Sequence, residues 1–333
     1  MAFFCSELNI LFRNSWVKTL SSFSEALQSL VDNEELPSTR TIRIALLDDG
    51  VDLHDKDLRR IAPQPTWGSG QSFCYVPTRQ LEGSPSPYWV SSRGHGTEMA
   101  KLILSVFPDA ELLIVKLGGS EVGRPTAESA AKAIQWAVEH KVDVISASWA
   151  IPRTDDNARF ITELDIAVFN AHKEKILIFC AASDVGVGKG FDYDIGDDYP
   201  AKCDRKVFCI GAATVSGARH PMVGSQIVHY CVPGQYVPAT AENGQSVTLQ
   251  GSSIATALAA GLAGLILYCV SLSERHRDML DRVKTRDGMQ KVLDSLRRNS
   301  GAEINLKHFD IHDEIDNPFG VRNFELLLHN LLL

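Results

Sequence analysis

The sequence has little that would hold a fold together covalently or through a metal. Its 333 residues include seven cysteines, an odd number, and no two of them form a Cys-x-x-Cys pair. Structural zinc sites require closely paired thiolates, so we do not expect one here. A chain of this length can bury a full hydrophobic core without such help. We therefore expect free, mostly buried thiols in a reducing compartment.

Positive charge is also in deficit. The chain has 33 Lys and Arg residues against 41 Asp and Glu residues, which gives a net charge of −8. A protein of this charge has no general attraction for phosphate backbones or anionic lipids, so we expect neither a nucleic acid nor a membrane as partner. The N-terminus lacks the basic segment of a signal peptide, and Glu7 and Arg13 interrupt its apolar run. These absences favour an intracellular, cytoplasmic protein.

From about residue 41 the sequence alternates between strand-like and helix-like segments. The β-rich runs lie at 41–47, 110–117, 142–148, 176–182 and 207–213. Helical patterns separate them at 95–106, 127–140 and 160–173. This alternation predicts an α/β fold with a mainly parallel sheet flanked by helices. Ligands of such sheets bind beyond the carboxyl ends of the strands, so reactive residues should follow strands.

One long apolar run has two interpretations. Residues 254–270 carry no charge over 17 positions, a length that approaches that of a membrane span. Seven of these residues are Ala or Gly, and no basic residue flanks the run on its N-terminal side. A helix buried in the core of a large α/β domain fits this composition better, and we expect that structure.

The two ends of the chain differ from its centre. We divide the sequence into an N-terminal helical leader and linker at 1–40, a main domain at 41–300 and an apolar tail at 301–333. Residues 15–30 have apolar side chains at helical spacing. The leucine-rich tail requires a covering surface, either on the same domain or on a partner protein. A protein partner would therefore bind through residues 15–30 or through the tail.

Three short segments combine a reactive side chain with glycine. Asp48-Asp49-Gly50 ends the first expected strand, Gly94-His95-Gly96-Thr97 opens an expected helix, and Gly251-Ser252-Ser253 opens the apolar helix. Each has an ordinary structural alternative, namely an Asp-Gly turn, a surface histidine or an N-capping serine. A serine at a helix N-terminus is also surrounded by free backbone N–H groups, which favour a nucleophile and stabilise an oxyanion.

Taken in chain order, these segments resemble the motifs of the subtilisin-like serine peptidases, or subtilases. The order Asp48, His95, Ser253 is the one known from subtilisin. The resemblance extends from about residue 41 to residue 270 and includes the run Gly251-Ser252-Ser253-Ile254-Ala255-Thr256. Since Asp48 and Ser253 are 205 residues apart and must meet, it implies one large domain.

The resemblance also implies a mechanism and a substrate class. His95 takes the proton of Ser253 as it attacks a peptide carbonyl, and Asp48 orients the imidazole. Ser148, Trp149 and Ala150 pair with an extended substrate by strand addition. The expected activity is that of a serine endopeptidase acting on a protein or peptide, with no cofactor.

The main departure from the family is at the oxyanion position. After the strand at 176–182, the family has an asparagine whose amide donates to the oxyanion, and this chain has Asp184. An ionised carboxylate repels an oxyanion, and loss of one such donor costs about 10²–10³ in rate, a magnitude known from subtilisin. We expect a slow or acid-shifted endopeptidase. The alternative is a catalytically weakened subtilase-fold module that binds or regulates.

Other departures concern Asp49, calcium and the specificity pocket. Asp49 stands where the family has Ser or Thr, and strand alternation should point it away from Asp48.

The chain has no insertion for the family's calcium loop after the His-bearing helix, and Asp57 alone does not make a site, so no metal is expected. An acidic cluster resembles part of the pocket wall, where it either selects basic substrates or is a solvated loop (Asp192, Asp194, Asp197 and Asp198).

Overall fold

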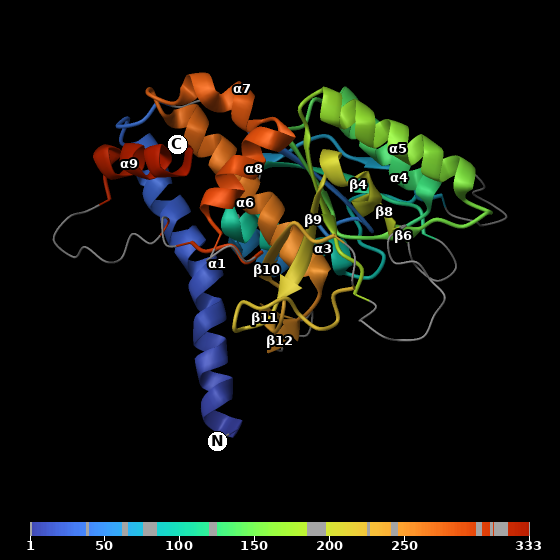
Figure 1. Ribbon diagram of the computed structural model, residues 1–333, viewed down its shortest axis with the longest axis horizontal. Coiled ribbons are helices and arrows are strands. Elements are labelled where there is room, and N and C mark those ends of the chain that lie inside the picture. Colours follow the sequence, from blue (N-terminus) through green and yellow to red (C-terminus); the bar gives the residue numbers. More distant parts are fainter. Residues whose placement is uncertain are drawn as a thin grey trace.

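A computed structural model describes most of the chain. It covers residues 2–37, 40–61, 66–75, 85–119, 125–184, 198–224, 227–240, 246–297, 302–306, 309 and 319–332. The order of its elements and the position of the two termini can be followed in Figure 1.

A parallel sheet of eight strands forms the centre of the fold (Figure 1). Its order is β10-β9-β7-β5-β1-β4-β2, with β3 also pairing with β4, and every pair of neighbours is parallel. The strands are β1 (Arg43–Asp48), β2 (Thr66–Trp67), β3 (Gln71–Ser72), β4 (Glu111–Lys116), β5 (Val144–Ala147), β7 (Leu177–Ala181), β9 (Phe208–Ala213) and β10 (Tyr230–Pro233). The five longer runs expected from the sequence are all strands of this sheet.

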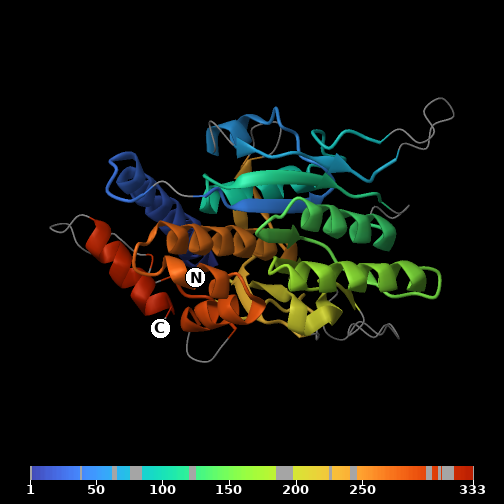
Figure 2. The same ribbon diagram turned by 90° about the horizontal axis from the view of Figure 1, so that it is seen from above.

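Helices cover both faces of the sheet, so its strands are apolar throughout rather than alternating. Alternate residues of β1 enter different cores: Ile44 and Leu46 pack with α3 (His95–Val106) and α6 (Ser252–Leu272). Ala45 and Leu47 pack instead with α4 (Ala127–Glu139) and α5 (Ala158–Lys173). Figure 2 gives the view from above, with α4 and α5 in green and α6 in orange. The predicted fold class, a mainly parallel sheet flanked by helices, is confirmed.

Helix α6 is the apolar run identified in the sequence. In the described part of the chain it alone is long and apolar enough to cross a membrane, yet 89% of its most apolar 18-residue window is buried. It packs against α3 and against the sheet. The expectation of a core helix is therefore confirmed.

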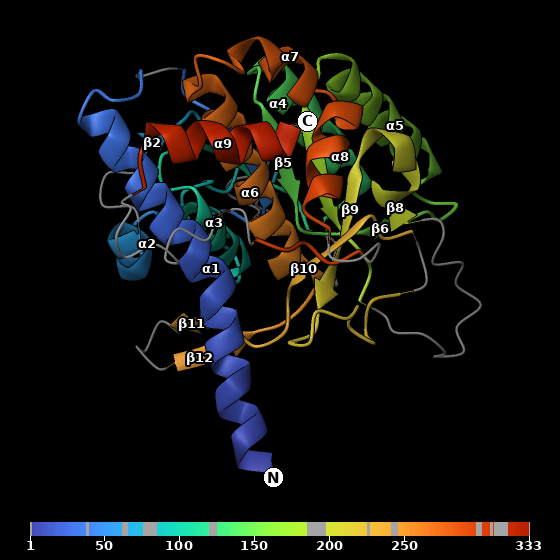
Figure 3. The same cartoon turned by 60° about the vertical axis from the view of Figure 1, so that its left-hand side comes forward.

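The leader helix α1 (Ala2–Asp32) packs against the outside of this layer, and Figure 3 shows it running past α3 and α9. The helix begins before the expected residue 15, and its spaced apolar side chains are buried as expected (Trp16, Leu20, Phe23, Leu27 and Leu30). In the C-terminal segment, α9 (Val321–Leu332) buries Phe324 and Leu328. Phe23 lies 5.0 Å from Phe309 and 5.4 Å from Phe319, ring centre to ring centre, so leader and tail meet within the chain.

Short elements complete the fold. Two antiparallel ribbons join β6 (Ile151–Pro152) with β8 (Asp198–Tyr199), and β11 (Val237–Thr240) with β12 (Ser246–Leu249). The remaining helices are α2 (Lys56–Ile61), η2 (Ala201–Lys206), η3 (Arg277–Met279), α7 (Leu280–Val283) and α8 (Arg286–Ser295). The six cysteines with described side chains are unpaired and five of them are buried, as expected.

Candidate active site

Three neighbouring strands and two helix N-termini meet at one edge of the sheet. Strand β1 ends at Asp48, β5 is followed by Ser148, and β7 is followed by Asp184. Helix α3 begins at His95, and α6 begins one residue before Ser253. Hydrogen bonds join Asp48 to His95 and Ser148 to Ser253. Because parallel strands end at the same edge of a sheet, both pairs lie at the carboxyl edge where ligands of such sheets bind.

Asp48 and His95 form the central ion pair of this edge. Asp48 Oδ1 lies 2.7 Å from His95 Nδ1, and the same oxygen accepts a hydrogen bond from Asp49 N at 2.8 Å. The Asp48 side chain is 6% exposed and that of His95 is 37% exposed. A carboxylate bonded to Nδ1 leaves Nε2 on the open side of the ring, where a general base needs it.

The pKa of His95 reflects this pairing. Burial lowers the pKa of the imidazole, because it disfavours the charged form. The charge of Asp48 and its hydrogen bond raise the pKa, the charge of Asp49 adds to them, and Arg93 opposes them. The net result is a His95 pKa raised above the ordinary value of 6.5. The site therefore favours the imidazolium that forms when His95 accepts a proton.

The backbone approaches closely where the His-bearing helix meets β1. A Cβ added to Gly96 would lie 2.1 Å from the carbonyl oxygen of Gly50, so any larger residue would push α3 away from Asp48. Glycine next to His95 is thus a packing requirement. Gly94 has a different reason, because its φ of 79° lies in the left-handed region that favours glycine.

Ser253 lies in the first turn of α6 and is bonded to the segment after β5. Its Oγ donates a hydrogen bond to the carbonyl oxygen of Ser148 at 2.9 Å, and Ser148 Oγ donates to the carbonyl oxygen of Ser253 at 3.1 Å. Within the described residues, no hydrogen bond joins the hydroxyl of Ser253 to the imidazole of His95. In this structure the hydroxyl of Ser253 is therefore directed to the Ser148 carbonyl.

Asp184 is engaged by the residue next to Ser253. Its Oδ2 accepts a hydrogen bond from Ser252 N at 2.7 Å, and its Oδ1 accepts one from Ser252 Oγ at 2.6 Å. Since Gly251, the N-cap of α6, has no side chain, Asp184 caps this helix from the segment that follows β7. Burial raises the pKa of the Asp184 carboxyl; the hydrogen bonds from Ser252 and the charge of His220 oppose this rise without cancelling it.

The segment expected to bind substrate is partly occupied by its own chain. The indole of Trp149 is buried and donates from Nε1 to the carbonyl oxygen of Leu47 at 2.9 Å, and Trp149 N donates to the carbonyl oxygen of Ala147. Ala150 is only partly buried. Trp149 therefore has little side-chain surface open to solvent, while Ala150 has more.

Of the four acidic residues expected near the specificity pocket, the structure describes one. Asp192, Asp194 and Asp197 lie outside the described residues, whereas Asp198 is in β8 and only 3% exposed. Asp198 is therefore not part of a solvated loop. In the described part of the chain, no three His, Cys, Asp or Glu side chains are grouped to hold a metal ion.

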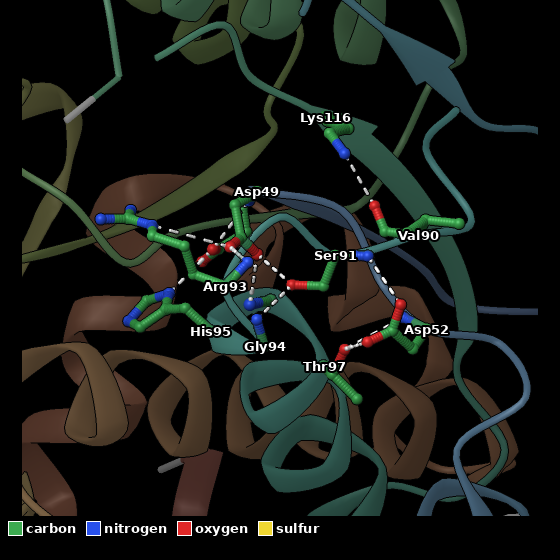
Figure 4. A network of polar contacts seen from close by, with 11 residues as sticks. Asp49, Asp52, Val90, Ser91, Arg93, Gly94, His95, Thr97 and Lys116 are labelled. Carbon is green, nitrogen blue, oxygen red and sulfur yellow. Dashed lines mark hydrogen bonds and ion pairs between the residues drawn. The ribbon is translucent and has the colours of Figure 1, made fainter. Parts of the chain in front are cut away.

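Sequence reasoning gave Asp49 little weight, and the structure gives it many contacts. Figure 4 shows its carboxylate among Ser91, Arg93 and the first residues of α3. One signal in the sequence could have pointed to it. The helix at His95 begins after a glycine, which has no capping side chain, so a cap had to come from elsewhere.

Comparison with known proteins agrees with this geometry. The model of the subtilase family matches residues 39–280. An intracellular serine protease of Paenibacillus polymyxa is 32% identical over 247 residues, covering 70% of this chain and 69% of that protein. The major intracellular serine protease of Bacillus subtilis (strain 168) is 30% identical, with 68% of each chain covered. A cold-adapted subtilisin-like serine proteinase of known structure superposes with a TM-score of 0.58 at 20% identity, over 79% of this chain and 86% of that one. The chain belongs to the subtilase family of serine peptidases.

Proposed function

We propose that this serine peptidase is an endopeptidase that uses Asp48, His95 and Ser253 as its catalytic triad. The observation that carries the proposal is the 2.7 Å contact between Asp48 Oδ1 and His95 Nδ1, at the sheet edge where α6 presents Ser253. A carboxylate in this position fixes the imidazole with Nε2 as the basic nitrogen.

The reaction proceeds by acyl transfer. Ser253 Oγ rotates from Ser148, gives its proton to His95 Nε2 and attacks the carbonyl carbon of a peptide bond. The imidazolium, stabilised by Asp48, then donates that proton to the leaving amine. Water, deprotonated by His95 in turn, hydrolyses the ester on Ser253 and restores the hydroxyl. Protein or peptide chains are the substrates, and their backbone aligns along residues 148–150.

The oxyanion is stabilised less well than in relatives that have an asparagine at this position. The N-terminus of α6 supplies backbone N–H groups and the positive end of its dipole. Asp184, however, offers carboxylate oxygens that accept from Ser252 rather than an amide that donates. Protonation of Asp184 requires acid, but the raised pKa of His95 requires a higher pH for the neutral base. Of the two expected consequences, a slow reaction is favoured over an acid-shifted one.

The direct test is cleavage of a denatured protein, followed by mass spectrometry of the products. We expect internal cleavage by the parent chain and none by Ser253→Ala. Cleavage that persists in Ser253→Ala at the parent rate would assign the activity to another residue. Removal of terminal residues alone would contradict an endopeptidase.

A second candidate function is a weakened subtilase module that binds or regulates without turnover. The observation in its favour is that both hydroxyl groups at the start of α6 are bonded elsewhere, Ser253 to Ser148 and Ser252 to Asp184. A fluorophosphonate probe separates the candidates. Labelling of Ser253 supports the endopeptidase, and its absence, with a peptide still bound, supports the module.

An intracellular setting belongs to the same proposal. The free cysteines and the names of the two bacterial relatives support it. A protein partner that binds through residues 15–30 or the tail, and the division of the chain at residues 40 and 300, also stay predictions. The buried apolar faces of α1 and α9 are already covered within the chain.

A further inference from the structure

The carboxylate of Asp49 is the most connected group beside the site. Its Oδ1 accepts hydrogen bonds from Ser91 Oγ at 2.6 Å and from Gly96 N at 2.8 Å, and its Oδ2 accepts one from Arg93 N at 2.8 Å (Figure 4). The Asp49 side chain is only 12% exposed. Three of its acceptor positions are thus used within the chain, so this carboxylate is not free to bind a substrate.

These bonds hold the backbone on both sides of His95. Gly96, which follows the histidine, donates directly to Asp49. Gly94, which precedes it, donates to Ser91 Oγ at 2.8 Å, and that hydroxyl is itself bonded to Asp49. The backbone N–H groups on both sides of His95 are therefore held by Asp49, that of Gly96 directly and that of Gly94 through the Ser91 hydroxyl.

The same carboxylate completes the N-terminus of the His-bearing helix. Gly94 is the N-cap of α3 and offers no side chain to the free N–H groups of the first turn. Asp49, which directly follows β1, caps the helix instead by accepting the hydrogen bond from Gly96 N. Its negative charge lies at the positive end of the helix dipole. A serine or threonine at this position would supply a hydroxyl without that charge.

We infer that Asp49 is a positioning residue, which orients His95 toward Asp48 by capping α3 and tethering the loop before it. This inference rests on the proposed function of His95 as general base. Asp49 also tunes the base, because its charge adds to that of Asp48 in raising the pKa of His95. In the described part of the chain, the charged groups that shift the pKa of His95 are Asp48, Asp49 and Arg93.

Asp52 provides a matched control. This carboxylate accepts a hydrogen bond from Ser91 N at 2.8 Å and one from Thr97 Oγ1 at 3.4 Å, so it also ties the loop to the first turn of α3. Among the described hydrogen bonds, none joins Asp52 to Gly94 or Gly96, and Asp52 is not among the charges that shift the pKa of His95. Loss of Asp52 therefore weakens the same loop, including Ser91, but leaves the hydrogen bond from Gly96 N to Asp49 and the charge of Asp49 beside His95 in place.

Two substitutions separate charge from geometry. Asp49→Asn keeps Oδ1 for Gly96 N and Ser91 Oγ but loses the charge and the acceptor of Arg93 N, whereas Asp49→Ala loses every one of these contacts. In Asp49→Asn we expect the pKa of His95 to fall and the rise of kcat/KM to move to lower pH, with kcat on the plateau within about five-fold of the parent. In Asp49→Ala we expect kcat to fall about 10- to 100-fold with KM nearly unchanged, as for a misaligned catalytic group.

The pKa is measured by NMR titration of the His95 ring in the Ser253→Ala background, with the resonance identified by its loss in His95→Gln. This readout does not depend on activity, so it distinguishes a failure of this inference from a failure of the proposed function. An unchanged His95 pKa in Asp49→Asn, or a fall in kcat in Asp52→Ala as large as in Asp49→Ala, would overturn the inference. If Asp49→Ala does not fold, the Asp49→Asn titration alone decides.

Discussion

Ser253 and Ser148 hold each other through two reciprocal hydrogen bonds, each hydroxyl donating to the carbonyl oxygen of the other residue, at 2.9 Å and 3.1 Å. Ser253, the proposed nucleophile, is thus hydrogen-bonded to residue 148 of the segment 148–150, which is expected to align the substrate. Under the proposed function, a substrate that pairs with residues 148–150 would compete for the Ser148 carbonyl and release the Ser253 hydroxyl toward His95. The proposal therefore couples substrate binding to activation of the nucleophile.

Removing the Ser148 hydroxyl tests this pairing. Ser148→Ala breaks the hydrogen bond to the Ser253 carbonyl but leaves the backbone acceptor of the Ser253 hydroxyl in place. We expect a loss of about 0.5–1.5 kcal/mol in the free energy of unfolding, measured by urea denaturation. Labelling of Ser253 by a fluorophosphonate should stay within a few-fold of the parent rate. Loss of labelling in a folded variant would show that the Ser148 hydroxyl itself takes part in the reaction.

The pH dependence of kcat/KM follows from the state of His95. The general base must be neutral, and the pKa of His95 is raised above 6.5, chiefly because Asp48 outweighs the effect of burial. Activity should therefore rise with pH through that raised value and should be low in acid. The measurement is kcat/KM against pH on an uncharged peptide. An acidic optimum would contradict the assignment of His95 as the base.

The effect of Asp184 is testable with one conservative change and one control. Asp184→Asn replaces the charge with an amide that can donate to the oxyanion, and we expect kcat at neutral pH to increase about 10- to 100-fold. Asp184→Ala removes the charge without adding a donor, so its increase should be smaller. A lower kcat in a folded Asp184→Asn would show that the carboxylate helps the reaction, as a cap of α6 or otherwise.

The leader helix should contribute to stability through Phe23. This side chain is fully buried and lies against Phe309 and Phe319. Phe23→Ala should cost about 3–5 kcal/mol in the free energy of unfolding, measured by denaturant titration. Phe169→Ala on α5 is the control, because Phe169 is 52% exposed, and it should change stability by less than about 0.5 kcal/mol. Equal effects of the two changes would refute the docking of α1 on the domain.

Sequence reasoning found those parts of the fold that carry long periodic patterns. The helix at 95–106 has the predicted bounds, and α6 was identified as a core helix from its small residues and lack of charge. The ribbons β6–β8 and β11–β12 were not predicted, because strands of two to four residues are too short to show periodicity. The apolar spacing at 15–30 predicted a helix whose spaced side chains are buried, but it did not predict that the helix begins at Ala2.

The site was predictable only where the residues carry a motif. Asp48 and His95 were identified from their glycine-rich motifs and are joined in the structure. The bonds of Ser253 to Ser148 and of Asp184 to Ser252 were not predicted, because they depend on how β5, β7 and α6 meet in space. For the same reason, the sequence alone did not reveal Asp49 as the cap of α3.

The most direct test of the account is the reaction of the parent chain with a fluorophosphonate, followed by mass spectrometry of the labelled peptide. A serine activated by His95 attacks the phosphorus and releases fluoride, which leaves one covalent adduct. The account predicts a single adduct on Ser253, abolished in Ser253→Ala and strongly slowed in His95→Gln. A folded parent chain that acquires no label, or that is labelled equally well without His95, would contradict the catalytic assignment.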